Sequence, residues 1–163
     1  MDKSEEKNGR YSTDFELYAD LTAHVVITVL LAWFFYIHTD GSFLAVALTF
    51  LGGILLDTDH FIDHFAHFGF KLDRETFMYH KYLDSGKCYI VFHSWELAIG
   101  ICSLSYYIPV LLPFGAGMFA HLLWDQLFSH IDEPLFYCLS YRMYNGFELE
   151  KISKKLYRKY KKD

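Results

Sequence analysis

At 163 residues the chain is long enough for one domain and too short for two ordinary ones. Its apolar fraction of 53% and aromatic fraction of 20% exceed those of a usual soluble domain. With 21% charged residues and a net charge of −5, this composition indicates apolar segments with polar ends and not a disordered chain. Three widely spaced cysteines without a CxxC pair argue against a disulfide framework or a cysteine zinc site. The N-terminus is polar and acidic, so we expect no secretory signal peptide.

Four apolar segments of the sequence predict helices. They cover residues 21–37, 42–56, 88–104 and 113–131. Each is near or below the roughly 20 residues that a helix needs to cross a hydrocarbon core of about 30 Å. By their length alone, these segments could therefore also be buried helices of a soluble all-α protein.

The placement of Lys and Arg favours a membrane protein. If the four segments cross a membrane, all 15 basic residues fall on one side of it, and the two opposite connections, residues 38–41 and 105–112, contain none. The positive-inside rule then places both termini in the cytoplasm. We predict an all-α integral membrane bundle of about four transmembrane helices in the inner, cytoplasmic membrane.

The ends of the chain differ from this core. We divide the chain into a polar tail (1–18), a helical membrane domain with a metal site (19–133) and a C-terminal segment (134–163). Residues 148–162 predict a basic amphipathic helix with Leu149, Ile152, Leu156 and Tyr160 on one face. Such a helix either lies on the protein core or attaches to anionic lipid headgroups, and the sequence leaves both open.

Histidine and carboxylate side chains interrupt the apolar segments near their cytoplasmic ends. The first segment carries His24, and the second ends in the stretch 57–64, Asp-Thr-Asp-His-Phe-Ile-Asp-His. The third opens with 92–96, Phe-His-Ser-Trp-Glu, and the fourth contains 121–125, His-Leu-Leu-Trp-Asp. At about 1.5 Å of rise per residue these groups all lie at a similar depth. Ionisable side chains in membrane segments are costly and usually face a bundle interior, where they pair or bind something.

Imidazole and carboxylate groups together suit a divalent metal ion. We expect one or two ions, with zinc first and manganese or magnesium as alternatives. More ligands are present than one tetrahedral zinc needs, and a pair of ions is suited to phosphoester hydrolysis. The predicted ligands are His24, Asp57, Asp59, His60, His64, His93, His121 and Asp125.

Each of these groups also has a simpler interpretation. His24 alone fits a hydrogen-bonded helix histidine, and His121 with Asp125 fits an intrahelical pair. The stretch 57–64 fits a solvated helix cap. We expect the other histidines of the apolar regions at the surface or an interface: His38, His67 and His130.

With these motifs the chain resembles the bacterial and archaeal family of membrane-bound metal-dependent hydrolases, which is similar to a reduced, membrane-embedded zinc-dependent phospholipase C. The counterparts of the family's motifs are His24, Leu56-Asp57-Thr58-Asp59-His60, Phe92-His93-Ser94 and His121 to Asp125, in the family's order over about residues 20 to 130. Leu56 replaces the family's proline, and His80-Lys81 stands thirteen residues before His93 instead of adjoining it. The resemblance implies a metal-dependent hydrolase.

We therefore expect an enzyme that cleaves a phosphoester of a lipid or amphiphile at the cytoplasmic face by a metal-activated water. Glu96 or Asp63 is expected to accept the proton, although Glu96 also fits a role in orienting His93. Lys81 or protonated His80 is expected to neutralise the phosphate. We expect no nucleic-acid partner.

Three alternatives remain open at this point. Intramembrane histidine and aspartate also line the paths of metal or proton transporters, but a path needs polar groups across the whole membrane, and here they gather at one side. A membrane protein that binds metal without catalysis is a second alternative, and a soluble all-α hydrolase with buried helices is a third.

Overall fold

The computed structural model of the chain describes residues 14–70, 81–128, 131 and 133–160, and this part is all-α, as predicted. It contains no β-strand; Lys87 and Glu148 form one isolated antiparallel bridge. The helices are α1 (Asp14–His38), α2 (Phe43–Gly53), η1 (Leu55–Asp57), α3 (Thr58–Phe68), η2 (Lys81–Ser85), α5 (Trp95–Leu104), η3 (Pro109–Leu111), α6 (Leu112–Phe128), α7 (Leu139–Tyr144), α8 (Leu149–Ile152) and α9 (Lys154–Tyr160).

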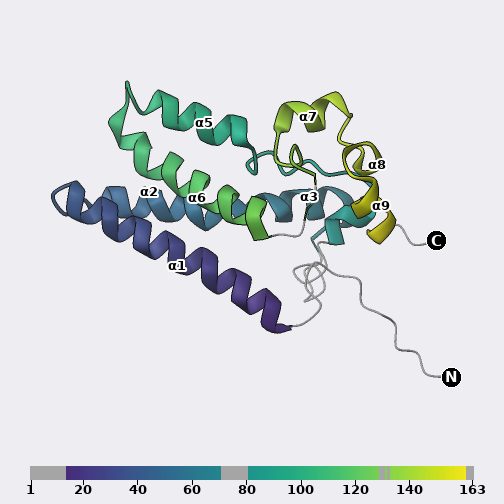
Figure 1. Cartoon of the computed structure of the whole chain (residues 1–163), viewed down its shortest axis with the longest axis horizontal. Coiled ribbons are helices and arrows are strands. Elements are labelled where there is room, and N and C mark those ends of the chain that lie inside the picture. Colours follow the sequence, from purple (N-terminus) through teal and green to yellow (C-terminus); the bar gives the residue numbers. More distant parts are fainter. Residues whose placement is uncertain (1–13, 71–80, 129–130, 132, 161–163) are drawn as a thin grey trace.

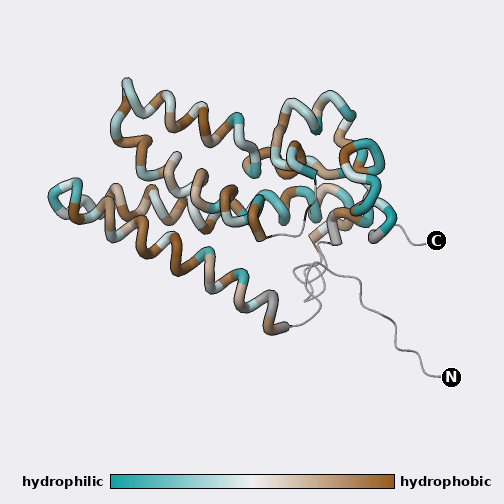
Figure 2. Tube along the Cα trace, in the orientation of Figure 1, coloured by the Kyte–Doolittle hydropathy of each residue, from teal (hydrophilic) through white to brown (hydrophobic). Residues whose placement is uncertain are grey.

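The four apolar segments form the long helices α1, α2, α5 and α6, which lie along one another (Figure 1). A tight turn with positive φ angles at Asp40 (49°) and Gly41 (78°) joins α1 to α2. The hydroxyl of Ser42 then caps α2 by accepting a hydrogen bond from the amide of Ala45 at 3.3 Å. Figure 2 shows hydrophobic residues along these four helices and hydrophilic ones gathered around α3, α8 and α9.

The third apolar segment is helical only in its second part. Helix α5 begins at Trp95, because Ser94 is its N-cap and accepts from the amide of Leu97 at 3.4 Å. The residues before it, 86–94, form an irregular loop in which Ile90 has a positive φ of 27°. The predicted helix from 88 to 104 is therefore wrong over residues 88–94, and His93 lies in a loop.

Glycines let α2 and α6 pack backbone to backbone, and these two helices form the most extensive contact of the bundle. A Cβ atom at Gly52 would overlap the carbonyl oxygen of Phe114, and one at Gly117 would lie 2.6 Å from the carbonyl oxygen of Thr49. Small residues allow such close approach. This packing brings the end of α2 next to the middle of α6.

Helix length and composition support fewer membrane spans than the four predicted. Within the described residues, one helix, Tyr18–His38, is long and apolar enough to cross a membrane. Helices α2 and α3, bent by 42° at the break between them, would add a second if they count as one span. The prediction of about four transmembrane helices is not confirmed by this criterion.

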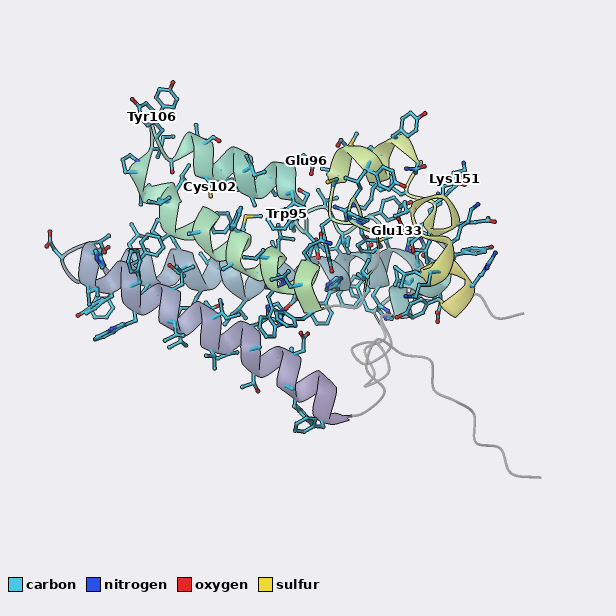
Figure 3. The ribbon with its side chains drawn as sticks, viewed as in Figure 1. Trp95, Glu96, Cys102, Tyr106, Glu133 and Lys151 are labelled. Carbon is cyan, nitrogen blue, oxygen red and sulfur yellow. The ribbon has the colours of Figure 1, made fainter. Side chains whose placement is uncertain are left out.

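The C-terminal segment is a set of short helices and not one amphipathic helix. Helices α8 and α9 are separated at Ser153, and the side chains of Leu149 and Ile152 are buried in the hydrophobic core. Leu156 and Tyr160 pack against the same core, while Lys151 is exposed (Figure 3). The apolar face of this segment therefore lies on the protein core, which was one of the two alternatives.

Candidate metal centre

Seven of the eight predicted ligands lie together. They come from α1, η1, α3, α6 and the loop before α5, and they form three overlapping groups whose donor atoms lie within 4.8 Å of one another. The groups are His24 with His121 and Asp125, Asp57 with His93 and His121, and Asp59 with His60 and His93. These groups could hold a metal ion.

His93 and His121 form the middle of this cluster. Their Nε2 atoms lie 3.2 Å apart. Asp57 Oδ1 lies 3.4 Å from Nε2 of His93 and 3.5 Å from Nε2 of His121. Asp125 Oδ2 lies 3.8 Å and 3.4 Å from the same two atoms. Ligands at about 2.0–2.1 Å from a tetrahedral zinc are separated by about 3.3 Å, and the donor atoms of Asp57, His93 and His121 match that spacing.

The other nitrogen of each central imidazole is held by a hydrogen-bond partner. Nδ1 of His93 lies 2.8 Å from Asp59 Oδ1, and Nδ1 of His121 lies 2.7 Å from the carbonyl oxygen of Gly53. In the neutral imidazoles, donation from Nδ1 would leave both Nε2 atoms as acceptors that face the centre, and metal-ligating histidines are commonly oriented in this way. Asp59 thus orients His93, and the close α2–α6 packing orients His121.

A further imidazole lies on each side of the central pair. Nε2 of His24 lies 3.4 Å from Asp125 Oδ1, and its ring stacks on that of His121 with centroids 4.1 Å apart. On the other side, Nε2 of His60 lies 3.7 Å from Asp57 Oδ1. Each outer histidine shares a carboxylate with the central pair, so the cluster has donors for a second ion as well.

Asp20 is a member of the site's surroundings that the sequence analysis missed. Its Oδ1 accepts a hydrogen bond from Trp124 Nε1 at 2.9 Å, and its Oδ2 lies 3.8 Å from Nε2 of His24. The signal for it is the spacing of four residues from His24, which places both on one face of α1.

In the absence of a metal ion, the neighbours of His93 raise its pKa. Burial alone would lower the pKa of His93, but the adjacent charge of Asp59 and hydrogen bonds with Asp57 and Asp59 raise it to about 9. A metal ion bound to His93 would therefore compete with a proton at neutral pH.

Asp63 and Glu96, the predicted proton acceptors, both bind backbone amides elsewhere. Asp63 Oδ2 accepts hydrogen bonds from the amides of Tyr89 at 2.8 Å and Ile90 at 3.1 Å. Glu96 lies at the start of α5 and points toward the first turn of α7 (Figure 3). It accepts from the amides of Leu139 and Ser140, both at 2.9 Å, and from Ser140 Oγ at 2.6 Å. The contacts of these two carboxylates give no support to their predicted role.

The remaining predicted residues that the structure describes do not join the cluster. His64 is buried but belongs to none of the three groups that the described residues form. His67 and His38 are exposed and contact backbone carbonyls of their own helices, as expected for surface histidines. His80, His130 and the side chain of Lys81 lie outside the described part of the chain.

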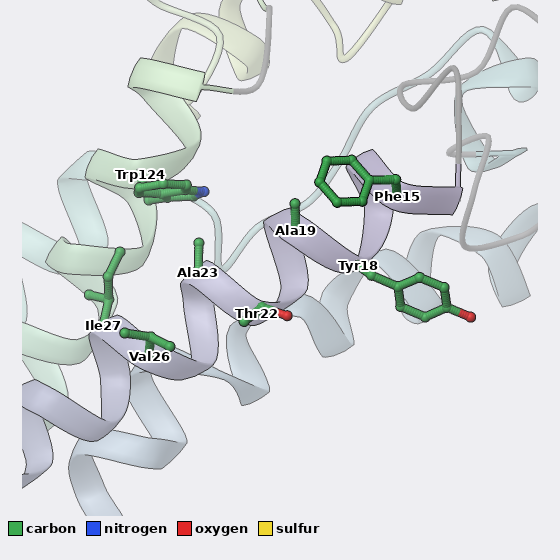
Figure 4. Close-up of a pocket in the computed structure, with 8 residues that line it drawn as sticks. All are labelled: Phe15, Tyr18, Ala19, Thr22, Ala23, Val26, Ile27 and Trp124. Carbon is green, nitrogen blue, oxygen red and sulfur yellow. The ribbon is translucent and has the colours of Figure 1, made fainter.

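An apolar groove of about 570 Å³ opens beside the cluster, between α1 and Trp124 of α6 (Figure 4). Phe15, Ala19, Ala23 and Val26 line its α1 side, where the two alanines leave space. The indole of Trp124 meets the ring of His24 edge-on with centroids 6.4 Å apart. Since His24 stacks on His121, the groove ends next to the candidate metal centre.

Comparison with known proteins found no matching family model, no matching curated protein and no matching solved structure. The family resemblance based on the short motifs therefore stays a prediction.

Proposed function

We propose that the chain is a membrane-embedded, metal-dependent hydrolase that cleaves a phosphoester of a lipid or amphiphile at the cytoplasmic face. The observation that carries the proposal is the buried pair of Nε2 atoms of His93 and His121, 3.2 Å apart, with Asp57 and Asp125 beside both. Zinc is the first choice of metal because two imidazoles and two carboxylates form a ligand set it accepts.

The proposed chemistry divides between the metal and the side chains. A divalent ion held by His93, His121 and Asp57 would supply a water ligand of lowered pKa and would polarise a phosphoryl oxygen. Asp59 and the carbonyl of Gly53 keep both central imidazoles in the tautomer that accepts at Nε2. Asp57 and His60 are the most accessible members of the cluster, with 38% and 20% of their side chains exposed, so water can reach the cluster on their side. His60 replaces Asp63 and Glu96 as the candidate proton acceptor.

Exposed apolar side chains support the membrane placement. Along α1, Phe15 is 79% exposed, Leu30 64% and Trp33 62%, on a helix of which one stretch is long enough to span. Apolar surface of this extent is unusual for a soluble monomer and marks contact with lipid or with protein. If α1 and the bent pair of α2 and α3 both span the membrane, all Lys and Arg of the sequence lie on one side of it, and this distribution favours lipid.

The apolar groove supports an amphiphilic substrate. Its α1 wall continues into the exposed apolar side chains of the same helix, and Trp124 in its lining contacts the ring of His24. An alkyl chain in the groove would place the attached phosphoester next to the donor atoms of His121 and Asp125. The gathering of the buried ionisable side chains in and around this one cluster gives the transporter alternative no support.

The test combines metal analysis with an esterase assay on detergent-purified protein. The wild type should contain a stoichiometric divalent metal and hydrolyse alkyl 4-nitrophenyl phosphates with a KM that falls as the alkyl chain lengthens. His121→Ala should lose both the metal and the activity, because it removes a central donor. His67→Ala, which removes an exposed histidine of α3, should keep both. A His121→Ala protein that is metal-free and fully active would reject the proposal.

A further inference from the structure

The loop that carries His93 has no regular secondary structure to satisfy its backbone. Buried amide and carbonyl groups need hydrogen-bond partners, so the source of those partners decides where the loop runs. Two carboxylates of α3 take the amides. Asp63 Oδ2 accepts from Tyr89 and Ile90, and Asp59 Oδ2 accepts from Phe92 at 2.9 Å and His93 at 3.1 Å.

The carbonyl groups of the same loop are bound by Arg142 of α7. One terminal guanidinium nitrogen donates to the carbonyl oxygens of Tyr89 at 3.0 Å and Ile90 at 2.9 Å. The other donates to the carbonyl oxygen of His93 itself at 2.8 Å. Arg142 is fully buried, with an exposed fraction of 0%, and is the one buried Lys or Arg within the described residues.

Helix α7 is in turn fixed to the start of α5. The carboxylate of Glu96 caps its first turn, and the amide of Trp95 donates to the carbonyl oxygen of Tyr137 at 3.0 Å. The amide of Cys88 also donates to the carbonyl oxygen of Phe147 at 3.0 Å. The C-terminal segment is thereby attached to both ends of the loop, so Arg142 acts on a loop whose flanks are already held.

We propose that Arg142 is a positioning residue of the metal centre: its guanidinium holds the backbone on both sides of His93 so that Nε2 of His93 faces His121. The planar fork of a guanidinium matches several acceptors at once, whereas an ammonium acts as a point charge. Burying a cation is costly, and the three carbonyl acceptors offset part of that cost. The inference rests on the proposed metal centre, and it makes the C-terminal segment part of that centre.

The experiment titrates metal-stripped protein in detergent with Co²⁺, whose visible spectrum reports ligand number and geometry. Arg142→Lys keeps the charge and Arg142→Gln keeps donor capacity, and neither can bridge the three carbonyls. Both should bind Co²⁺ about 10- to 100-fold more weakly than the wild type, with an altered spectrum, as is typical when the support of a metal ligand is removed. In Arg142→Ala, added guanidinium should restore part of the affinity.

The control separates positioning from general loss of stability. Ile152→Ala removes a buried side chain of the same C-terminal segment, so it should lower the unfolding temperature but leave the Co²⁺ affinity and spectrum unchanged. Wild-type affinity and spectrum in both Arg142→Lys and Arg142→Gln would overturn the inference. A wild type that binds no Co²⁺ would instead overturn the metal centre, and the inference with it.

Discussion

The two central histidines reach the same point by different means. His121 is placed by the packing of α6 on α2, where glycines allow backbone contact and the carbonyl of Gly53 holds Nδ1 at 2.7 Å. His93 is placed by a loop that is held by the carboxylates of Asp59 and Asp63 and by a buried guanidinium. The position of His121 therefore depends on close steric fit, and that of His93 depends on buried charged groups. Different substitutions should displace the two histidines.

One added methyl group should disrupt the packing of α2 on α6 that positions His121. Gly52→Ala puts a Cβ onto the carbonyl oxygen of Phe114, so α2 and α6 have to separate. We expect a loss of about 3 kcal/mol in the free energy of unfolding, together with loss of metal, because Asp57 of η1, which follows α2, moves away from His121. Thermal unfolding in detergent and metal analysis measure both effects.

Gly100→Ala is the matched control for this change. Gly100 lies inside helix α5, and a Cβ there meets nothing within 4 Å. The substitution should raise stability by about 0.5–1 kcal/mol through helix propensity and leave metal binding unchanged. If Gly52→Ala behaved in the same way as Gly100→Ala, the close packing of α2 and α6 would not be what positions His121.

The loop that carries His93 should be disturbed when a carboxylate of α3 loses one acceptor oxygen. Asp59→Asn and Asp63→Asn make the same chemical change one turn apart on α3, and each leaves loop amides without their carboxylate partner. Each should cost about 1–3 kcal/mol of stability. Metal affinity should fall further in Asp59→Asn, because Asp59 binds His93 itself and Asp63 binds only the earlier part of the loop. Equal affinities in the two variants would contradict this division of roles.

The positions of the two histidines also differ in how far sequence predicts them. The shared face of His121 and Asp125 followed from helical spacing, because residues four apart share a helix face whatever surrounds them, and the similar depth of His24 followed from the rise of a helix. The loop before α5 could not be predicted in this way. Its apolar composition resembles that of a helix, and its path is set by Asp63 and Arg142, which lie 26 and more residues away in the chain.

Contacts between residues far apart in the chain also explain why the structure does not support the predicted roles of Asp63 and Glu96. A carboxylate near a metal motif resembles a proton acceptor in sequence, and only the fold shows that Asp63 binds amides of the loop and Glu96 caps α7. The number of spans was overestimated because α2, α5 and α6 are each shorter than the apolar segments that predicted them, and residues 88–94 of the third segment are not helical. The choice between core packing and lipid attachment for residues 148–162 likewise required the positions of Leu149 and Ile152.

The smallest effect should come from Glu96, which acts on His93 only through α7 and Arg142. Its slight burial would raise its pKa, but hydrogen bonds from Ser140 and the amides of α7 lower it to about 2. A carboxylate with a lowered pKa stabilises the fold above its unfolded pKa, near 4.5, and this stabilisation is lost as the pH falls toward 2. Because Glu96 is exposed, solvent screening should keep the effect below about 1 kcal/mol.

Glu96→Gln should therefore unfold at a lower temperature than the wild type at pH 7, and the difference should shrink as the pH falls from about 4.5 toward 2. Ser140→Ala removes one of the three hydrogen-bond donors and should show a smaller difference of the same sign. Both variants should keep most of their Co²⁺ affinity, because Arg142 and the two aspartates still hold the loop. A loss of Co²⁺ affinity in Glu96→Gln as large as that in Arg142→Gln would mean that the α7 cap, and not the guanidinium, determines where His93 points.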